Sequence, residues 1–266
     1  MISNQIFIGT SGWEYKEWAG DFYRGVKSKE HFPVYANHFG TVEINATFYR
    51  LPDLKAVHGW RKKAPEAFVF AVKGSRFITH IKRLNRLGNS VNRFFRRLQP
   101  LEAKVGPFLW QLPPNFQKDM KRLKGFLRRL PKRFSHAFEF RHLSWLDSET
   151  KRLLQDFNAA LVWVSSLKMP EDFSVTANFA YIRFHGLSGG PRHDYTRAEL
   201  DPWARHIREQ TESGRRVFAY FNNDLNVRAP KNARLLIDMC ANDGSSDSGE
   251  GSPRLNAANR TGRQAN

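Results

Sequence analysis

The chain has 266 residues, a length that fits one large α/β domain or two domains of ordinary size. Hydrophobic residues make up 41% of the sequence and aromatic residues 14%, which is enough for a sizeable core and excludes a wholly disordered chain. Lys and Arg number 43 against 25 Asp and Glu, a net charge of +18. This charge predicts attraction to polyanions and says nothing about the fold.

Three features of the sequence exclude further classes of protein. No apolar run approaches the ~20 residues of a membrane-spanning helix. The first ten residues, MISNQIFIGT, lack the basic and apolar regions of a secretory signal. The single cysteine, Cys240, excludes an intramolecular disulfide and a cysteine-rich metal site. We therefore expect a cytoplasmic protein without membrane association, bound metal or cofactor.

Eight short segments rich in β-branched and aromatic residues predict β-strands. They begin at Ile6, Thr41, Phe68, Pro107, His136, Ala159, Phe179 and Arg216. The mean spacing between their first residues is about 30 residues, which is the length of one strand–helix unit.

Most of the intervening segments have the apolar periodicity of helices. Such periodicity occurs in residues 32–39, 91–98, 120–130 and 153–157. The clearest predicted helix begins with a capping box, Thr196 to Glu199, and ends at Gly214. Pro230 is suited to the start of a final helix. Residues 168–178 lack periodicity, which predicts a truncated helix or a loop there.

The alternation of strands and helices predicts an α/β protein with a single (β/α)₈ TIM barrel and a truncated connection after the sixth strand. The alternative is an open, doubly wound sheet. Residues 9–13, GTSGW, follow the first strand but lack the third glycine and the helix-opening context of a dinucleotide fingerprint. We therefore favour the barrel. It is expected to span residues 1–240, because residues 241–266 hold one Leu and no aromatic residue, which predicts a disordered polar tail.

Polar residues end several of the predicted strands, at the end of a TIM barrel where active sites lie. In the segment TVEIN, Val42 and Ile44 must face the helices, so Glu43 and Asn45 face the lumen. The same alternation predicts further inward residues: Lys73, Ser75, Gln111, Glu139, Arg141, Arg183, His185 and Asn222. Burying charge in a lumen is costly, so this convergence indicates a functional site. The alternative is an ion-pair network that closes the barrel.

Aromatic residues are frequent in the loops after these strands. They are Trp13, Tyr15, Trp18, Phe48, Tyr49, Phe116 and Trp145. Aromatic walls with a few polar groups are typical of a small-molecule pocket, and the alternative is that part of this set fills loop cores. Three other aromatic residues are expected to pack helices against the barrel: Trp60, Trp203 and Phe94.

Seven ordered segments resemble the motifs of a known family. They are residues 9–23, 41–52, 70–84, 111–116, 137–145, 181–186 and 220–224, which include GTSGWEYKEWAGDFY, TVEINATFYRLP and YFNND. In these segments the chain is similar to the YecE-like proteins, domain of unknown function 72. The resemblance spans about residues 6–237; it implies a TIM barrel and implies no defined activity.

The positions that match the family's motifs include most of the predicted lumen residues. They are Gly9, Thr10, Gly12, Trp13, Glu43, Asn45, Thr47, Phe48, Tyr49, Lys73, His80, Gln111, Glu139, Arg141, Trp145, Arg183, His185, Gly186, Asn222, Asn223 and Asp224. After the sixth strand, many members of the family carry an Asp where this chain has Ser165 or Ser166. If that Asp acts in the other members, the resemblance implies that this chain is altered there.

We expect an enzyme, a hydrolase or a lyase, that acts by acid–base chemistry on a small substrate bearing phosphate or carboxylate. The predicted lumen set holds two carboxylates against three permanent cations, which makes the mouth electropositive. The catalytic candidates are Glu43, Glu139, His185 and Lys73. The substrate-binding candidates are Arg141, Arg183, Asn45, Gln111, Asn222, Trp13, Tyr49 and Trp145. Lys73 could be a positioned cation or, if desolvated, a base or Schiff-base nucleophile.

Three alternatives stay open. Residues 80–133 hold 15 Lys and Arg against two acids, which favours a nucleic-acid-binding protein or a phosphodiesterase, although this stretch is predicted on the outer wall. Glu43 and Glu139 could be the carboxylate pair of a glycoside hydrolase, but Lys73 and Arg141 would lower carboxylate pKa values and oppose proton donation. The third alternative is a non-catalytic scaffold protein, but such a protein does not need polar side chains in the barrel lumen. The sequence does not predict an oligomeric state.

Overall fold

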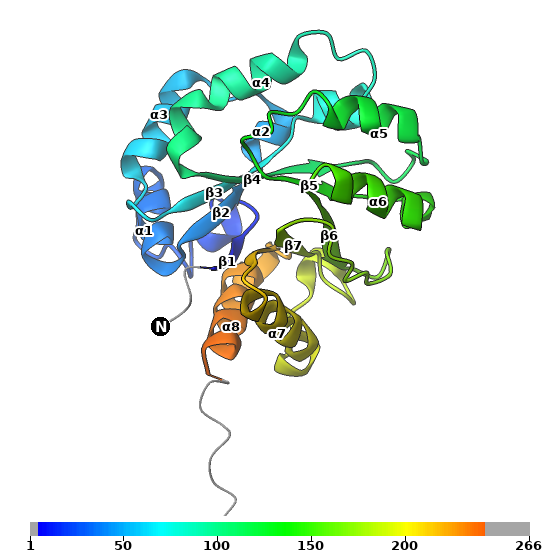
Figure 1. The fold of residues 1–266 in the computed structure, drawn as a ribbon. Coiled ribbons are helices and arrows are strands. Elements are labelled where there is room, and N and C mark those ends of the chain that lie inside the picture. The colour runs from blue at the N-terminus through cyan, green and yellow to red at the C-terminus, as the bar shows by residue number, and fades with distance from the viewer. Residues whose placement is uncertain (1–4, 243–266) are drawn as a thin grey trace, which may run out of the picture.

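The computed structural model describes residues 5–242, and eight parallel strands with helices on the outside make up this part of the chain (Figure 1). The strands are β1 (Ile6–Thr10), β2 (Thr41–Ile44), β3 (Val69–Lys73), β4 (Val105–Gln111), β5 (His136–Glu139), β6 (Ala159–Ser165), β7 (Phe179–Phe184) and β8 (Arg216–Phe221). All eight predicted strands are confirmed, and so is the α/β barrel. Most of the predicted polar tail, from residue 243 onward, lies outside the described residues.

The helices also follow the expected order. They are α1 (His31–His38), α2 (Ala46–Tyr49), α3 (Leu54–Lys63), α4 (Ser90–Leu98), α5 (Met120–Leu127), α6 (Ser148–Asp156), α7 (Arg197–Glu212) and α8 (Arg228–Asn242). Seven short helices lie within residues 5–242: η1 (Lys16–Trp18), η2 (Ser28–Glu30), η3 (Phe77–Ile81), η4 (Gln99–Lys104), η5 (Leu143–Trp145), η6 (Gly190–Arg192) and η7 (Leu225–Val227). Thr196 and Glu199 form both hydrogen bonds of the predicted capping box.

The truncated connection is confirmed, because the described residues between β6 and β7 form no helix. Across residues 5–242, no helix combines the length and the apolar character needed to span a membrane.

The barrel is nearly closed, and β1 and β2 are the two end strands that meet to close it. The hydrogen-bonded strand order is β1-β8-β7-β6-β5-β4-β3-β2. β1 and β2 meet through a parallel bridge between Ser11 and Glu43, and the amide of Gly12 donates to the carbonyl oxygen of Glu43 at 2.8 Å. A Cβ atom on Gly9 would lie 2.4 Å from the carbonyl oxygen of Thr41, so only glycine permits this close approach of β1 to β2.

Two apolar layers flank the strands and confirm the predicted alternation of side chains. The outer layer lies between strands and helices and contains the side chains expected to face outward, such as Val42, Ile44 and Ile182. The inner layer fills the lumen and contains, among others, Ala71, Leu109, Ala137, Val162, Tyr181 and Tyr220. The lumen is therefore packed, as is usual for this fold, and side chains beyond the inner layer form the mouth.

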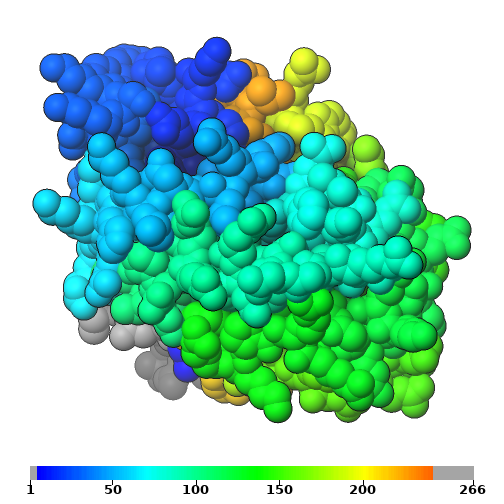
Figure 2. Space-filling model, turned by 90° about the horizontal axis from the view of Figure 1, so that it is seen from above, coloured from blue at the N-terminus to red at the C-terminus, as the bar shows by residue number. Residues whose placement is uncertain are grey.

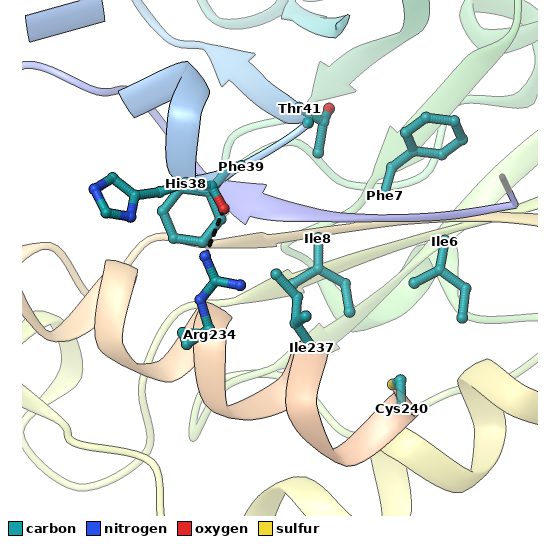
Figure 3. A pocket seen from close by; sticks show the side chains of 10 residues that line it. Ile6, Phe7, Ile8, His38, Phe39, Thr41, Arg234, Ile237 and Cys240 are labelled. Carbon is teal, nitrogen blue, oxygen red and sulfur yellow. Dashed lines mark hydrogen bonds between the residues drawn. The ribbon is translucent and has the colours of Figure 1, made fainter. Parts of the chain in front are cut away.

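A hollow of about 200 Å³ lies at the opposite end of the barrel, at the amino ends of β1 and β2 and against α8 (Figure 3). Apolar side chains such as Ile6, Ile8 and Ile237 form much of its wall. Arg234 is the one Lys, Arg, Asp or Glu among the described residues that line it, and it donates a hydrogen bond to the carbonyl oxygen of His38 at 2.7 Å. This hollow lies far from the carboxyl ends of the strands, so we do not assign the functional site to it.

Candidate active site

An arginine bridges two carboxylates at the carboxyl end of the barrel. Arg183, on β7, donates from Nη2 to Glu43 Oε1 at 2.8 Å and from Nη1 to Glu139 Oε2 at 2.6 Å. Glu43 lies on β2 and Glu139 ends β5, and none of the three side chains is more than 1% exposed. We call these three residues the ionic bridge. Its members come from separate strands, as the alternation of side chains predicted.

Glu43 is held as a carboxylate by several donors. The hydroxyl of Tyr181 donates to its Oε2 at 2.7 Å, and Ser11 Oγ donates to its Oε1. Burial by itself raises the pKa of Glu43, but the charges of Arg183 and Lys73 and these hydrogen bonds outweigh burial and leave the pKa below its ordinary value. Glu43 is therefore ionised and fully partnered at neutral pH.

Glu139 joins the ionic bridge to a histidine. Its Oε1 accepts from Gln111 Nε2 at 2.8 Å and lies 3.0 Å from His185 Nε2. Burial would raise the pKa of Glu139, but Arg183, His185 and Arg141 hold it well below its ordinary value. The carboxylate thus accepts hydrogen bonds on both of its oxygens.

His185 is a neutral imidazole in this setting. Burial lowers its pKa, and the opposing attraction of Glu139 does not restore it. With its Nε2 hydrogen donated to Glu139, the lone pair lies on Nδ1, which is 3.3 Å from Asn222 Nδ2. Glu139 therefore selects the tautomer of His185 and leaves Nδ1 as the basic nitrogen.

A pocket of about 660 Å³ lies at the barrel mouth, beside His185. We call it the cationic pocket. Its ionisable residues other than Tyr49 are Lys73, Arg76, His80, Arg141, Lys168 and His185, and Tyr49, Gln111 and Asn222 also line it. No carboxylate is among the described residues that line this pocket. The field inside it is consequently positive.

Lys73 ends β3 and is 8% exposed, yet it forms no ion pair or hydrogen bond through Nζ with any residue in the described range. Its Nζ lies 4.4 Å from the centre of the Phe48 ring. Burial and the nearby charge of Arg183 lower the pKa of Lys73 to about 8, although Glu43 and Glu139 oppose this shift. The ammonium group is thus available to an anion below that pH.

The pKa of His80 is lowered by burial and by the positive charges of the same pocket. It lies on η3, where its Nδ1 is 2.9 Å from Thr79 Oγ1. Burial, followed by the charges of Lys73 and Arg141, lowers its pKa to about 4. His80 is therefore neutral at physiological pH and can take part only as a hydrogen-bonding group.

A second pocket, of about 680 Å³, adjoins the cationic pocket and shares Tyr49 and Asn222 with it. We call it the aromatic pocket. It is lined by Gly12, Trp13, Glu14, Tyr15, Asn45, Ala46, Tyr49, Trp60, Asn222 and Asp224. Trp60 lies against Trp13 at 5.8 Å between ring centres, so it lines this pocket in addition to packing α3 against the barrel.

The structure thus brings most of the expected site residues to one mouth, in three groups. The cationic pocket holds Lys73, His185, Arg141, Gln111, Tyr49 and Asn222. The aromatic pocket holds Trp13 and Asn45 and shares Tyr49 and Asn222. The ionic bridge of Glu43, Arg183 and Glu139 is buried and lines neither pocket.

Two expectations from the sequence need correction. Trp145 was expected to bind substrate, but it is fully buried, donates from Nε1 to the carbonyl oxygen of Phe116 at 2.7 Å and stacks on Phe140. It fills a loop core instead. Arg183 was expected to clamp an anion, but it is fully buried and both of its terminal amino groups are bound to carboxylates. The structure therefore places Arg183 between two carboxylates and not in the lining of either pocket.

Three charged residues of the two pockets were not predicted from the sequence. Arg76 and Lys168 line the cationic pocket from the loops after β3 and β6, and Glu14 lines the aromatic pocket from the loop after β1. Asp224, which the resemblance to the family singles out, lines the aromatic pocket after β8. Loop residues have no strand alternation to orient them, so the usable signal is only their position within a few residues of a strand end. Ser166 also lines the cationic pocket, whereas Ser165 is buried with Oγ 2.8 Å from the hydroxyl of Tyr195.

The ionic bridge weakens the glycoside hydrolase alternative. The guanidinium of Arg183 occupies the space between Glu43 and Glu139, where such a mechanism needs the scissile bond. Within residues 5–242, no group of three or more His, Cys, Asp or Glu side chains is arranged to hold a metal ion.

Residues 80–133 include the helices α4 and α5, whose exposed cations lie on the outer wall. Figure 2 looks onto this wall, where the chain runs from blue-cyan through green. The exposed cations there include Arg93 and Arg96 on α4, Lys121 and Lys124 on α5, and Arg128 directly after α5. Of the basic residues in this stretch, four form ion pairs within the described part of the chain: Lys104, Lys118, Arg122 and Arg133. The nucleic-acid alternative stays a prediction that concerns this wall and not the mouth.

The substitution Arg183→Gln should lower the free energy of unfolding by about 3–5 kcal/mol, because it leaves Glu43 and Glu139 buried without their shared cation. The matched control is Arg205→Gln, which removes an arginine that is 61% exposed and pairs with Asp201 at 3.3 Å. We expect the control to cost less than about 1 kcal/mol. Urea unfolding followed by circular dichroism measures both, and equal effects in the two variants would contradict the role given to the ionic bridge.

Comparisons with known proteins agree with the fold and with the resemblance found in the motifs. The chain is 34% identical to UPF0759 protein YecE of Escherichia coli K12 over 138 residues, which cover 52% of this chain and 48% of YecE. The matched segment thus spans about half the length of that relative. UPF0759 protein YunF of Bacillus subtilis is 26% identical and is matched over 88% of this chain and 94% of its own length.

Solved structures share the same architecture. A DUF72 family protein from Thermotoga maritima MSB8 has a TM-score of 0.80 at 27% identity and covers 89% of this chain and 99% of its own. A DUF72 family protein from Enterococcus faecalis V583 has a TM-score of 0.74 at 20% identity, over 94% of this chain and 100% of its own. The family described as "Protein of unknown function DUF72" matches residues 7–256. The chain therefore belongs to the DUF72 family.

Proposed function

We propose that this chain is an enzyme that binds a small substrate through a phosphate or carboxylate group in the cationic pocket and acts on it by acid–base chemistry. One observation carries the proposal. Four Lys and Arg side chains line a single pocket at the barrel mouth, with no carboxylate among its described lining residues. The ionic bridge holds two carboxylates and one guanidinium, a net charge of −1, so it offsets only part of the charge of these four cations.

Lys73 and Arg141 are the best placed of the four cations to hold the anion. Neither forms an ion pair with a described residue, so the anion need not displace an existing partner. The planar guanidinium of Arg141 can donate two parallel hydrogen bonds to a phosphate or carboxylate, and Lys73 supplies a nearby point charge. Arg76 and Lys168 are exposed and extend the positive field outward.

His185 and Glu139 supply the proton transfer in this proposal. Glu139 fixes the Nε2–H tautomer of His185, so the Nδ1 lone pair can accept a proton once the substrate takes the place of Asn222 Nδ2, which lies 3.3 Å from Nδ1. When His185 takes up that proton, the adjacent carboxylate stabilises the imidazolium that forms. The same pair can return the proton to a leaving group, so it serves hydrolysis and elimination alike. Arg183, itself bound to Glu43, holds Glu139 in place, and neither Glu43 nor Arg183 lines the cationic pocket.

The substitution Arg141→Gln should weaken the binding of sulfate, used as an anion probe, by at least about tenfold, because it removes a charged donor from the pocket. Isothermal titration calorimetry at low salt measures this effect. The matched control is Arg93→Gln on the outer wall, which should leave the affinity unchanged. If wild-type protein does not bind sulfate even at millimolar concentration, the proposal fails.

Sulfate affinity should also fall as the pH rises through about 8, because Lys73 loses its proton there. Sulfate keeps its two charges throughout this range, so any change comes from the protein. The lysine binds the anion in its charged form, which is present below its pKa and lost above it. The variant Lys73→Gln should bind sulfate more weakly at pH 7 and show no inflection near pH 8. An inflection that persists in the variant would assign the effect to another group.

A further inference from the structure

The aromatic pocket is lined by aromatic side chains and carboxylates, which do not bind an anion. We infer that the substrate joins its anionic group to a planar ring bearing N–H donors, and that this ring lies in the aromatic pocket while the anion lies in the cationic pocket. The inference rests on the proposed function, since the bound anion sets the position of the ring.

The two pockets form one extended binding surface. Their volumes are about 660 and 680 Å³, and Tyr49 and Asn222 line both. Each is within the range that a drug-sized ligand fills, whereas a single phosphate fills a small part of either. A molecule anchored in the cationic pocket therefore has one direct path for its remainder, past Tyr49 and Asn222.

Aromatic side chains provide the walls for a flat ring. Trp13 is held edge-on by Trp60 and by Phe32, with ring centres 5.8 and 5.2 Å away. Tyr49 is 78% exposed, so most of its ring is free to cover a ligand. Aromatic rings stack on flat heterocycles with little regard to their substituents, which makes these walls suited to a planar group.

Asn45 and Asp224 bring acceptor oxygens to the wall of this pocket. Asn45 Oδ1 is buried and has no hydrogen-bond partner in residues 5–242, while the Nδ2 of the same side chain donates to Ser11 Oγ at 2.8 Å. Asp224 forms no ion pair with a described residue, and burial together with Glu17 raises its pKa. The loop that carries Asp224 is fixed, because Trp18 Nε1 donates to its backbone carbonyl at 2.9 Å. The carboxylate of Asp224 is placed to accept hydrogen bonds from ring or amino N–H groups.

The charges of the two pockets fix the direction of the ligand. The aromatic pocket contains the carboxylates of Glu14 and Asp224 and no Lys or Arg among its described lining residues. A phosphate placed there would be repelled, and the cationic pocket would attract it instead. The ligand is thus expected to bind in one orientation, with its ring beside Asn45 and Asp224.

Four probes test this inference on the full chain by calorimetry: inorganic phosphate, ribose 5-phosphate, glucose 6-phosphate and adenosine 5′-monophosphate. We expect adenosine 5′-monophosphate to bind at least tenfold more tightly than either sugar phosphate, and inorganic phosphate to bind no more tightly than the sugar phosphates. Quenching of tryptophan fluorescence by the nucleotide, and not by the sugar phosphates, would report the ring beside Trp13 and Trp60.

Two variants locate the ring. Asp224→Asn and Trp13→Leu change residues that line the aromatic pocket and not the cationic pocket. Each should remove most of the nucleotide's advantage over ribose 5-phosphate and leave the affinity for inorganic phosphate within twofold. The matched control is Leu143→Ala, which truncates an exposed side chain, 63% exposed, outside both pockets and should change nothing.

The outcomes separate this inference from the proposed function. If inorganic phosphate binds but the nucleotide gains nothing over ribose 5-phosphate, the inference is overturned and the proposed function stands. Glucose 6-phosphate binding as tightly as the nucleotide would overturn it in favour of a sugar ring. If no probe binds, both the inference and the proposed function fail.

Discussion

The arrangement of the mouth depends on one buried interaction, the guanidinium of Arg183 shared between Glu43 and Glu139. Three charges in a barrel lumen would be prohibitive if any one lacked a partner. Here each terminal amino group of the arginine has its own carboxylate. Ser11, Tyr181, Gln111 and His185 complete the hydrogen bonding of the carboxylate oxygens. Through Glu139, the ionic bridge holds Gln111 and His185, which line the cationic pocket.

The same bridge limits how far its two carboxylates offset the cations at the mouth. Because both carboxylates are bound to Arg183, they remain ionised but cannot pair fully with Lys73, whose amine has a pKa of about 8. The surrounding loops add further cations without carboxylates on the cationic side. The aromatic pocket has the opposite character, with Glu14 and Asp224 beside its rings. The barrel mouth thus contains two adjoining pockets, one lined by cations and the other by aromatic rings and carboxylates.

Strand alternation is strong enough to predict much of this site from the sequence. An apolar outer face forces the neighbouring residues inward, and Glu43, Lys73, Glu139, Arg183 and His185 are all found on the lumen side of their strands. Alternation does not reveal which charge pairs with which. It therefore could not show that Arg183 would be occupied by carboxylates, since this depends on the distances between three strands.

Loop residues were harder to predict, because no repeating geometry orients them. Trp145 follows β5 closely, yet the turn of η5 directs it beneath the loop, where the carbonyl oxygen of Phe116 accepts its indole N–H. Arg76 and Lys168 are the opposite case, because they line the cationic pocket although they were not predicted to do so. Nothing in their sequence context distinguishes them from the many exposed Lys and Arg residues of the chain. Only the folded arrangement separates these cases.

Anomalous diffraction from a crystal soaked in selenate tests the account most directly, since it locates a bound divalent oxyanion without any assumption about the reaction. The account predicts an anomalous peak in the cationic pocket, within hydrogen-bonding distance of Lys73 and Arg141, while Arg183 keeps both of its carboxylate partners. A peak bound to Arg183, or peaks confined to the outer wall of α4 and α5, would contradict it.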